Sequence, residues 1–334
     1  MSTTLTKNDF KTDQEVRWCP GCGDYSILNA VQTVFPTLGI PRENFVVVSG
    51  IGCSSRLPYY VNTYGFHSIH GRAPAVATGV KIANPELSVW IGTGDGDSLS
   101  IGGNHLIHAM RRNLDVKLLM FNNRIYGLTK GQFSPTSEIG KVTKSTPYGV
   151  VDAPFNPILL ALGAGATFVA RSVDVMPKHL IDILTRAANH KGFAFVEIYQ
   201  NCNIFNDGAF DHLVDKEVRD DKLVDLQHGK PVKFGKYKDK GIVLRGFKPE
   251  VVELKNTPES ELLVWDENDP SGALAYFIGA MAEGEMPQPI GVLRSVEKPT
   301  FDSGVHAQIN RVNKKEGPGD LHSLLYSGDT WEVK

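Results

Sequence analysis

Short apolar runs alternate with amphipathic segments along the first two hundred residues. The runs are rich in β-branched and aromatic residues and predict strands that are buried on both faces, at residues 45–48, 87–91, 116–121, 167–171 and 193–199. Apolar residues at helical spacing predict helices between them, at residues 24–34, 73–82, 101–112 and 175–189. In the helix over 101–112, we expect Leu106, Ile107 and Met110 to face inward. Alternating strands and helices indicate an α/β fold with a mostly parallel central sheet and helices on both faces.

The pattern changes near residue 210. Residues 211–229 are highly charged, with apolar residues at helix-like spacing. Short runs typical of strands follow at residues 231–235, 241–246 and 250–254. A last αβ stretch spans 262–296, and the remainder is polar and rich in proline and glycine. We therefore expect a main domain over 1–210 and a smaller C-terminal extension over 211–334, which packs on the main domain or on a partner.

Composition narrows the possible partners and location. The chain has 334 residues, 41% of them hydrophobic and 22% charged, with a net charge of −2. It is therefore long enough for one large domain with an appendage. It has no excess of basic residues of the kind that binds nucleic acid. The polar N-terminus has no apolar secretion signal, and no apolar run is long enough to cross a bilayer. We expect a soluble, cytoplasmic protein without a nucleic-acid or membrane partner.

The first candidate chemistry follows two neighbouring strands. Gly94, Asp95 and Gly96 come after the run 87–91, and Asn123 ends the next predicted strand. Because parallel strands end at one edge of a sheet, these residues should meet there. Carboxylate and amide oxygens suit Mg²⁺ bound to a diphosphate, and the glycines let backbone N–H groups approach the phosphates. The alternative is an ordinary Gly-Asp turn next to an unrelated strand end.

Another glycine-rich turn, residues 49–56, follows the run 45–48 and should lie beside Asp95. This turn would carry Cys53 to the same crevice. Residues 126–150 contain many prolines and glycines with little periodicity, which predicts a long functional loop.

The four cysteines are Cys19, Cys22, Cys53 and Cys202. Cys19 and Cys22 form a CxxC turn, whereas Cys53 and Cys202 each follow a predicted strand. Four thiolates can hold zinc or an iron–sulfur cluster, and one pair joined by two distant cysteines favours a cluster against a large domain. The alternatives are zinc, a thioredoxin-like redox pair, and inert buried thiols; a redox pair would need a strand before Cys19.

Taken together, these motifs resemble one known family. The segments WCPGCG, GIGCSSR, HGRAPAVATGVK, GTGDGDSLSIGGNH and NNRIYGLTKGQ, with Cys202, are similar to the β subunit of 2-oxoacid:ferredoxin oxidoreductases. The resemblance covers about residues 15–205, is greatest to the 2-oxoglutarate branch, and continues more loosely through PIGVLRSVEKPTFD. It implies a thiamine-diphosphate-binding domain of the diphosphate type.

The resemblance also assigns roles to single residues. It implies that one [4Fe–4S] cluster is held by Cys19, Cys22, Cys53 and Cys202. It implies that Mg²⁺ is held by Asp95, Asn123 and the backbone carbonyl of Ile125. Thiamine diphosphate would touch Ile51, Gly52, Cys53, Ser54, His70, Gly96, Asp97, Gly127 and Leu128. Asp97 can instead be a helix cap. Lys130 matches a position implicated in coenzyme A binding.

The activity implied is the reversible oxidative decarboxylation of 2-oxoglutarate to succinyl-CoA and CO₂, with electrons leaving singly through the cluster to ferredoxin. In this family the catalytic glutamate lies in the pyrimidine-binding domain of an α subunit. The present chain shows one thiamine-type domain. We therefore expect it to be active only with that α subunit, as αβ or (αβ)₂.

Substrate choice is left open by the residues. Arg56 can pair with the distal carboxylate of a dicarboxylic 2-oxoacid, or it can be a solvated surface arginine. The same chemistry on pyruvate or on a branched-chain 2-oxoacid is the first alternative. Less favoured alternatives are a non-oxidative thiamine decarboxylase or carboligase and a zinc-stabilised scaffold subunit.

Overall fold

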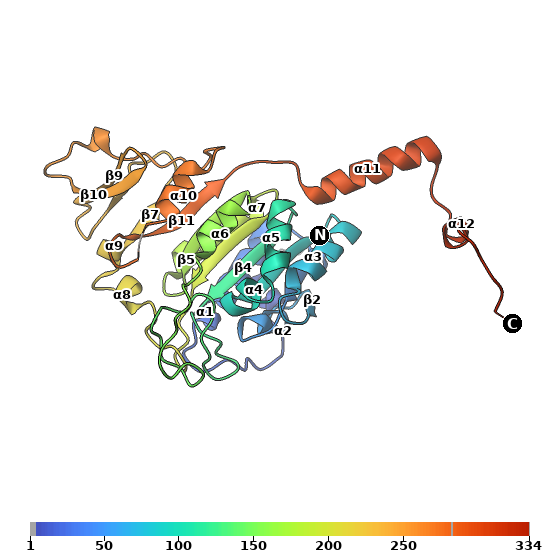
Figure 1. Ribbon diagram of the computed structural model, residues 1–334, viewed down its shortest axis with the longest axis horizontal. Coiled ribbons are helices and arrows are strands. Elements are labelled where there is room, and N and C mark those ends of the chain that lie inside the picture. The colour runs from blue at the N-terminus through green and yellow to red at the C-terminus, as the bar shows by residue number, and fades with distance from the viewer. Residues whose placement is uncertain (1–4, 282, 334) are drawn as a thin grey trace.

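A central eight-stranded sheet organises the computed structural model, which describes residues 5–281 and 283–333. The strands lie in the order β2-β1-β3-β4-β6-β5-β11-β7 (Figure 1). Their bounds are β1 Phe45–Ser49, β2 Tyr64–His67, β3 Ser88–Gly94, β4 Lys117–Asn122, β5 Phe168–Val173, β6 Ala194–Tyr199, β7 Leu223–Leu226 and β11 Gln288–Ser295. The six strands from β2 to β5 are parallel, and β11 and β7 run the opposite way. The predicted mostly parallel α/β sheet is therefore confirmed.

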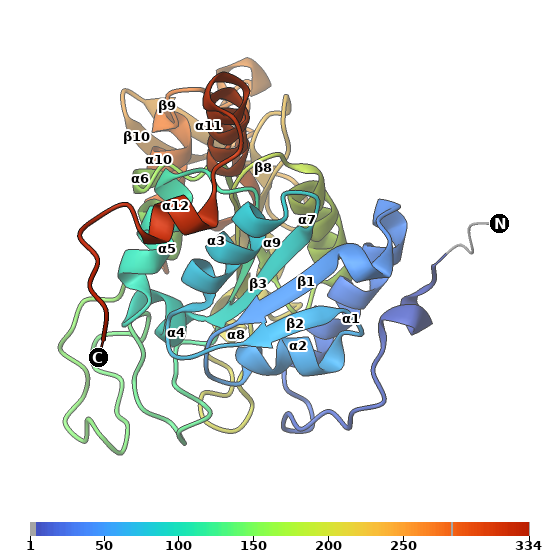
Figure 2. The ribbon, with the colours of Figure 1, turned by 90° about the vertical axis from the view of Figure 1, so that its right-hand side faces the viewer.

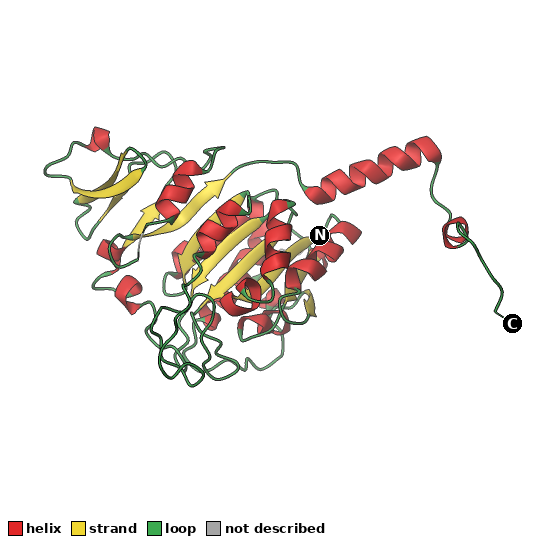
Figure 3. Cartoon of the chain, viewed as in Figure 1, coloured by secondary structure: helices red, strands yellow, loops and turns green. Residues whose placement is uncertain are grey.

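Helices cover both faces of this sheet (Figure 3). One face carries α1 Asp24–Val34 and α7 Pro177–Asn189. The other face carries α3 Ala73–Ala83, α5 Gly103–Arg111, α6 Pro157–Gly163 and α10 Ala273–Gly279. Shorter helices lie at α2 Leu57–Tyr60 and α4 Asp95–Leu99.

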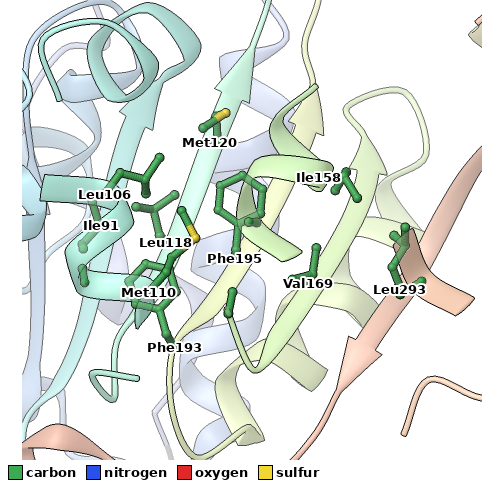
Figure 4. Packing of buried hydrophobic residues seen from close by; sticks show 14 of the residues in the cluster. Ile91, Leu106, Met110, Leu118, Met120, Ile158, Val169, Phe193, Phe195 and Leu293 are labelled. Atoms are coloured by element: carbon green, nitrogen blue, oxygen red, sulfur yellow. The ribbon is translucent and has the colours of Figure 1, made fainter. Parts of the chain in front are cut away.

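Side chains that alternate along each strand enter two separate cores. Val46 and Val48 pack in the core under α3 and α5, whereas Phe45 and Val47 pack in the core under α1 and α7. Figure 4 shows part of the first core, where Leu106 and Met110 of α5 pack against strand residues such as Leu118. Because both faces are covered, the strands are mostly apolar and do not alternate between apolar and polar residues.

The predicted helix over 101–112 is confirmed as α5, but one of its inward-facing residues was wrong. A separate short helix, α4, precedes it and ends at Leu99, because the ψ of −108° at Ser100 lies outside the helical region. Ile107 does not face inward but is 37% exposed, and Ala109 is buried on the inner face with Leu106 and Met110. The helical spacing was correct, but Ala109 takes the place of Ile107 among the inward-facing residues.

The C-terminal extension contributes strands to the main sheet. The predicted helix-like segment 211–229 consists instead of two one-turn helices, α8 Asp211–Val214 and α9 Arg219–Lys222, followed by β7. Parallel pairing with β11 buries Leu223, Val224 and Leu226, and this tertiary contact overrides the helical spacing. The short predicted strands form an antiparallel sheet of β8 Lys233–Phe234, β9 Lys240–Arg245 and β10 Lys248–Glu253. The division into domains at residue 210 stays a prediction.

The polar end of the chain contains a long helix that the sequence pattern did not predict. The helix α11 Phe301–Glu316 projects away from the body and is followed by α12 Leu321–Leu325 (Figures 1 and 2). Thr300 caps α11 by accepting a hydrogen bond from the backbone N–H of Ser303. Asp302 is buried, and it anchors the helix by accepting the backbone N–H of Asp115 at 3.0 Å. Among the described residues, no helix is long and apolar enough to span a membrane.

Candidate functional site

A pocket of about 110 Å³ opens where β1, β3 and β4 end. It is lined by every residue that the sequence assigned to thiamine diphosphate or magnesium, namely Ile51, Gly52, Cys53, Ser54, His70, Gly94, Asp95, Gly96, Asp97, Asn123, Ile125, Gly127 and Leu128. Four further residues complete the lining, Ile101, Phe121, Tyr126 and Thr129. Four separate segments of the chain thus meet at one edge of the sheet.

Asp95 provides the carboxylate of this pocket. It is the first residue of α4 and only 2% exposed. Its Oδ2 accepts hydrogen bonds from Ser134 Oγ at 2.5 Å and from Thr136 Oγ1 at 2.6 Å. Burial raises the pKa of Asp95 in spite of these two donors. A buried anion of this kind is stabilised by a cation, so the observed environment fits the predicted magnesium ligand.

Asn123 adds an amide oxygen to the same pocket. Its Nδ2 donates to Gln200 Oε1 at 2.9 Å, while its Oδ1 accepts the backbone N–H of Ile125 at 3.2 Å. The described residues contain no group of three or more His, Cys, Asp or Glu side chains arranged to hold a metal ion. The predicted magnesium set is of another kind, because it joins one carboxylate to amide and carbonyl oxygens.

Glycine is required at two positions around Asp95. A Cβ on Gly96 would lie 2.2 Å from Cε1 of Tyr126, whose hydroxyl donates to the Gly96 carbonyl at 3.1 Å. A Cβ on Gly50 would lie 1.9 Å from Oδ2 of Asp97. These glycines therefore allow the turns to approach closely enough to form the pocket.

Asp97 joins the loops around the pocket. Its Oδ1 accepts the backbone N–H groups of Ile51 at 3.1 Å and Gly71 at 2.8 Å. Its Oδ2 accepts the hydroxyl of Thr93 at 2.9 Å. The carboxylate is thus bonded to protein donors from three segments, and this side chain holds the turn after β1 against the turn after β3. Contact of Asp97 with a diphosphate stays a prediction.

The cysteines converge beside this pocket. Sγ of Cys202 and Sγ of Cys53 lie 3.3 Å and 3.9 Å from the point where a Cβ on Gly127 would stand. Sγ of Cys22 accepts a hydrogen bond from Gln200 Nε2 at 3.3 Å. All four cysteines are free thiols. Two loops therefore bring the thiols of Cys53 and Cys202 beside Gly127, and Cys22 lies at Gln200, although the described cysteines do not form a group of three or more side chains arranged to hold a metal ion. Cys53 and Gly127 also line the cofactor pocket.

Backbone contacts hold the CxxC turn against the loop that contains Cys202. The N–H of Gly23 donates to the carbonyl of Asn201 at 3.1 Å, and Asn203 Nδ2 donates to the carbonyl of Pro20 at 2.6 Å. Trp18 Nε1 donates to the carbonyl of Cys53 at 2.7 Å, which joins the third loop. These bonds position all three loops without help from the thiols themselves.

The thiols lie in an environment that opposes thiolate formation. Burial, and next the negative charge of the neighbouring Asp24, raise the pKa of Cys53 to about 12. The same two causes raise the pKa of Cys22 well above its usual value. Metal ligation requires thiolates, so cationic iron would have to offset this penalty. Cys202 is buried and Cys22 and Cys53 are partly buried, which fits ligands of a cluster, whereas Cys19 is exposed.

The two substrate candidates, Arg56 and Lys130, lie in different cavities. Arg56 lines a cavity of about 450 Å³ that shares Ile51, Gly52 and Leu128 with the cofactor pocket. Lys130 lines a groove of about 470 Å³, together with Lys141, Lys144 and Phe205 among others. The structure thus places Arg56 directly beside the cofactor pocket and Lys130 on a basic surface groove.

Several residues of the site were missed in the sequence. Ser134 and Thr136, which hold Asp95, belong to the long loop over residues 123–156, a fully described segment without helix or strand. Gln200 and Tyr126 were also missed. The hydroxyls in the segment Ser134-Pro135-Thr136-Ser137 were the one available signal, but only the fold shows which carboxylate they reach.

Comparisons with known proteins agree with this geometry. Residues 50–198 match the family model described as thiamine pyrophosphate enzyme, C-terminal TPP binding domain. The chain is 53% identical to the 2-oxoglutarate oxidoreductase subunit KorB of Mycobacterium tuberculosis, over 97% of this chain and 88% of that protein. It is 50% identical to the β subunit of 2-oxoacid:ferredoxin oxidoreductase 1 of Aeropyrum pernix, over 59% of this chain and 62% of that protein.

A solved structure is similar over nearly the whole chain. It is the 2-oxoglutarate:ferredoxin oxidoreductase from Magnetococcus marinus with 2-oxoglutarate, coenzyme A and succinyl-CoA bound. The TM-score is 0.78 at 33% identity, covering 98% of this chain and 97% of that one. The likeness therefore includes the C-terminal extension as well as the thiamine-type domain.

Proposed function

Because the chain belongs to the family of 2-oxoacid:ferredoxin oxidoreductase β subunits, in the 2-oxoglutarate branch, we propose that it catalyses CoA-dependent oxidative decarboxylation of 2-oxoglutarate to succinyl-CoA and CO₂. Electrons leave one at a time through a single [4Fe–4S] cluster to ferredoxin. One observation supports this most directly: the pocket around Asp95 and the converging cysteines share Cys53 and adjoin at Gly127. A non-oxidative thiamine enzyme has no use for such a pair of adjacent sites.

The cofactor pocket holds magnesium through Asp95, Asn123 and the Ile125 carbonyl. Bound thiamine diphosphate supplies the electron sink that a 2-oxoacid needs for decarboxylation. Gly94 and Gly96 let backbone N–H groups reach the diphosphate, and the ring of Tyr126 closes over Gly96. Ser134 and Thr136 orient the Asp95 carboxylate by donating to its Oδ2.

The cluster is held by Cys19, Cys22, Cys53 and Cys202. Its closeness to the cofactor follows from Cys53, which is a ligand on one side and part of the pocket lining on the other. The chain contains four cysteines in all, so it can ligate one cluster of this type and no relay of several. A relay to the acceptor protein would have to come from other chains.

As the family resemblance implies, the α subunit supplies the pyrimidine-binding domain and its catalytic glutamate, and this chain supplies the thiamine-binding domain matched over residues 50–198. The active site therefore lies at the subunit interface, in an αβ or (αβ)₂ enzyme located in the cytoplasm. Arg56 binds the distal carboxylate of 2-oxoglutarate from the neighbouring cavity, and Lys130 binds coenzyme A.

The decisive experiment is co-expression with the α subunit and anaerobic purification. We expect stoichiometric thiamine diphosphate, four iron and four sulfide per chain as the proposed cluster requires, and ferredoxin reduction that depends on both 2-oxoglutarate and coenzyme A. A panel of 2-oxoacids then ranks 2-oxoglutarate against pyruvate and branched-chain substrates. A colourless protein without iron would indicate a non-oxidative thiamine enzyme. Stoichiometric zinc without thiamine diphosphate would indicate a scaffold subunit.

Asp95→Ala tests whether the two sites are separate. Loss of the carboxylate should abolish magnesium-dependent binding of thiamine diphosphate while the electron paramagnetic resonance signal of the reduced cluster persists. Simultaneous loss of both would contradict the assignment of Asp95 to magnesium alone.

A further inference from the structure

Gln200 lies between the two candidate metal centres. It follows β6 directly, is 1% exposed, and stands two residues before Cys202. Its backbone N–H donates to the carbonyl of Asn122 at 2.9 Å, which holds its main chain beside β4. The side chain is therefore fixed at the boundary between the cofactor pocket and the cysteines.

Both ends of the Gln200 amide are bonded inside the protein. Nε2 donates to the carbonyl of Asn201 at 2.5 Å and to Sγ of Cys22 at 3.3 Å. Oε1 accepts from Nδ2 of Asn123 at 2.9 Å. Each of the two amide hydrogens and the amide oxygen thus has a partner.

The Asn201 carbonyl determines which way these amides face. A carbonyl oxygen can only accept, so Nε2 of Gln200 must face it and Oε1 must face Asn123. Oε1 can only accept as well, so Asn123 presents its Nδ2 to Gln200. The Oδ1 of Asn123 is thereby turned away from Gln200 and accepts the backbone N–H of Ile125 at 3.2 Å. Gln200, oriented by a backbone carbonyl, and the Ile125 N–H therefore favour the same orientation of the Asn123 amide, with Nδ2 toward Gln200.

The other contact of Gln200 is an N–H donated to sulfur. A donor directed at a ligand sulfur stabilises the more negative, reduced form of an iron–sulfur cluster, because hydrogen bonds to the sulfurs are among the determinants of cluster potential. The Gln200 amide therefore contacts one predicted ligand of each centre.

We propose that Gln200 is a positioning residue shared by both centres: it orients Asn123 for magnesium and donates to Cys22 to raise the reduction potential of the cluster. This inference rests on the proposed function, since it takes Asn123 and Cys22 as ligands. Side chains that support metal ligands commonly contribute 10–100-fold to metal affinity. Both effects are measurable without turnover.

Two substitutions separate the two contacts. Gln200→Leu removes both, so magnesium should bind about 10–100-fold more weakly at saturating thiamine diphosphate, and the cluster potential should fall. In Gln200→Glu, the carboxylate still accepts from Asn123 but has no hydrogen to donate to Cys22, and its negative charge adds to the fall in cluster potential. We expect nearly unchanged magnesium affinity and a lower cluster potential for this variant.

The measurements use the intact αβ enzyme. Isothermal titration calorimetry with Mg²⁺ gives the affinity, and a redox titration followed by electron paramagnetic resonance gives the potential. Gln32→Leu is the matched control, because Gln32 is also a buried amide that donates to a backbone carbonyl, that of Tyr60 at 3.0 Å. Loss of the Gln32 amide should lower thermal stability and leave the magnesium affinity and the cluster potential unchanged.

The outcomes distinguish this inference from the proposed function. If the unmodified enzyme lacks the cluster or magnesium-dependent cofactor binding, the proposed function fails. If it has both and folded Gln200→Leu enzyme retains both values, the role of Gln200 is refuted. Should Gln200→Leu fail to assemble, Gln200→Met, which is neutral, of similar length and also without an N–H, takes its place: an unchanged cluster potential refutes the role and a lowered potential supports it.

Discussion

Removal of the Thr136 hydroxyl is the sharpest test of how the Asp95 carboxylate is held. Thr136 is buried, and its Oγ1 lies 2.6 Å from Asp95 Oδ2 and 3.0 Å from Asn122 Oδ1. Thr136→Val keeps the shape and deletes the donor. Asp95 then retains a single hydroxyl donor to Oδ2, that of Ser134.

The expected magnitude follows from the type of hydrogen bond. A hydrogen bond to a buried charged group contributes about 1.5–3 kcal/mol. Since about 1.4 kcal/mol corresponds to a tenfold change in affinity, we expect magnesium affinity to fall by up to about 10–100-fold, the upper value applying if the hydrogen bond acts on the ion-bound state alone. Thr136→Ser retains the hydroxyl and should remain close to the unmodified enzyme.

The pH dependence gives a second signature of the same contact. Magnesium binds the ionised carboxylate, and burial raises the pKa of Asp95, so affinity should decrease as the pH is lowered. The Thr136 hydroxyl counteracts that rise in pKa. In Thr136→Val, the decrease should therefore begin at a higher pH than in the unmodified enzyme.

Magnesium titrations of the αβ complex at saturating thiamine diphosphate, repeated across pH, measure both effects. Equal affinity and an equal pH profile for Thr136→Val and the unmodified enzyme would refute the reasoning. Equal losses in Thr136→Val and Thr136→Ser would show that packing of the methyl group, rather than the hydroxyl, supports the site.

Three further predictions follow from other contacts. Arg56→Ala should raise KM for 2-oxoglutarate more than for pyruvate, because only the former has a distal carboxylate, and equal effects would remove that role. Gly96→Ala should abolish thiamine diphosphate binding in calorimetry, since the new Cβ meets Tyr126 at 2.2 Å; retained binding would mean that the ring moves freely. Burial, and next Asp174, raise the pKa of Asp24 to about 7, so folding stability should fall as the pH rises through that value. Asp24→Asn should raise Tm at pH 8 and reduce the Tm difference between pH 6 and pH 8, whereas a pH dependence equal to that of the unmodified protein would contradict this.

The sequence was sufficient for the parts of the fold with a strong local pattern. The runs that became β1, β3, β4 and β6 are mostly apolar because helices cover both of their faces, so their burial is evident from composition. The glycine-rich turns after β1 and β3 fall at one edge of the sheet, because parallel strands share a direction. Family resemblance then assigned residues that the structure brings into one pocket.

Elements whose conformation depends on a distant partner were not predictable in this way. Residues 223–226 have helical spacing but form β7, because β11, whose paired residues lie 65 positions later, pairs with them. The helix α11 lacks a buried stripe and is anchored through Asp302 to Asp115, a contact between residues 187 positions apart.

The same distinction separates the ligands of the site from their supports. Asp95, Asn123 and the cysteines could be found from motifs, because their chemistry requires particular residue types at particular strand ends. Thr136 lies 41 positions from Asp95, and Gln200 lies 77 positions from Asn123 and 178 from Cys22. Hydrogen bonds over such separations depend on how the loops fold back on the sheet, so only the tertiary structure shows which side chains orient the ligands.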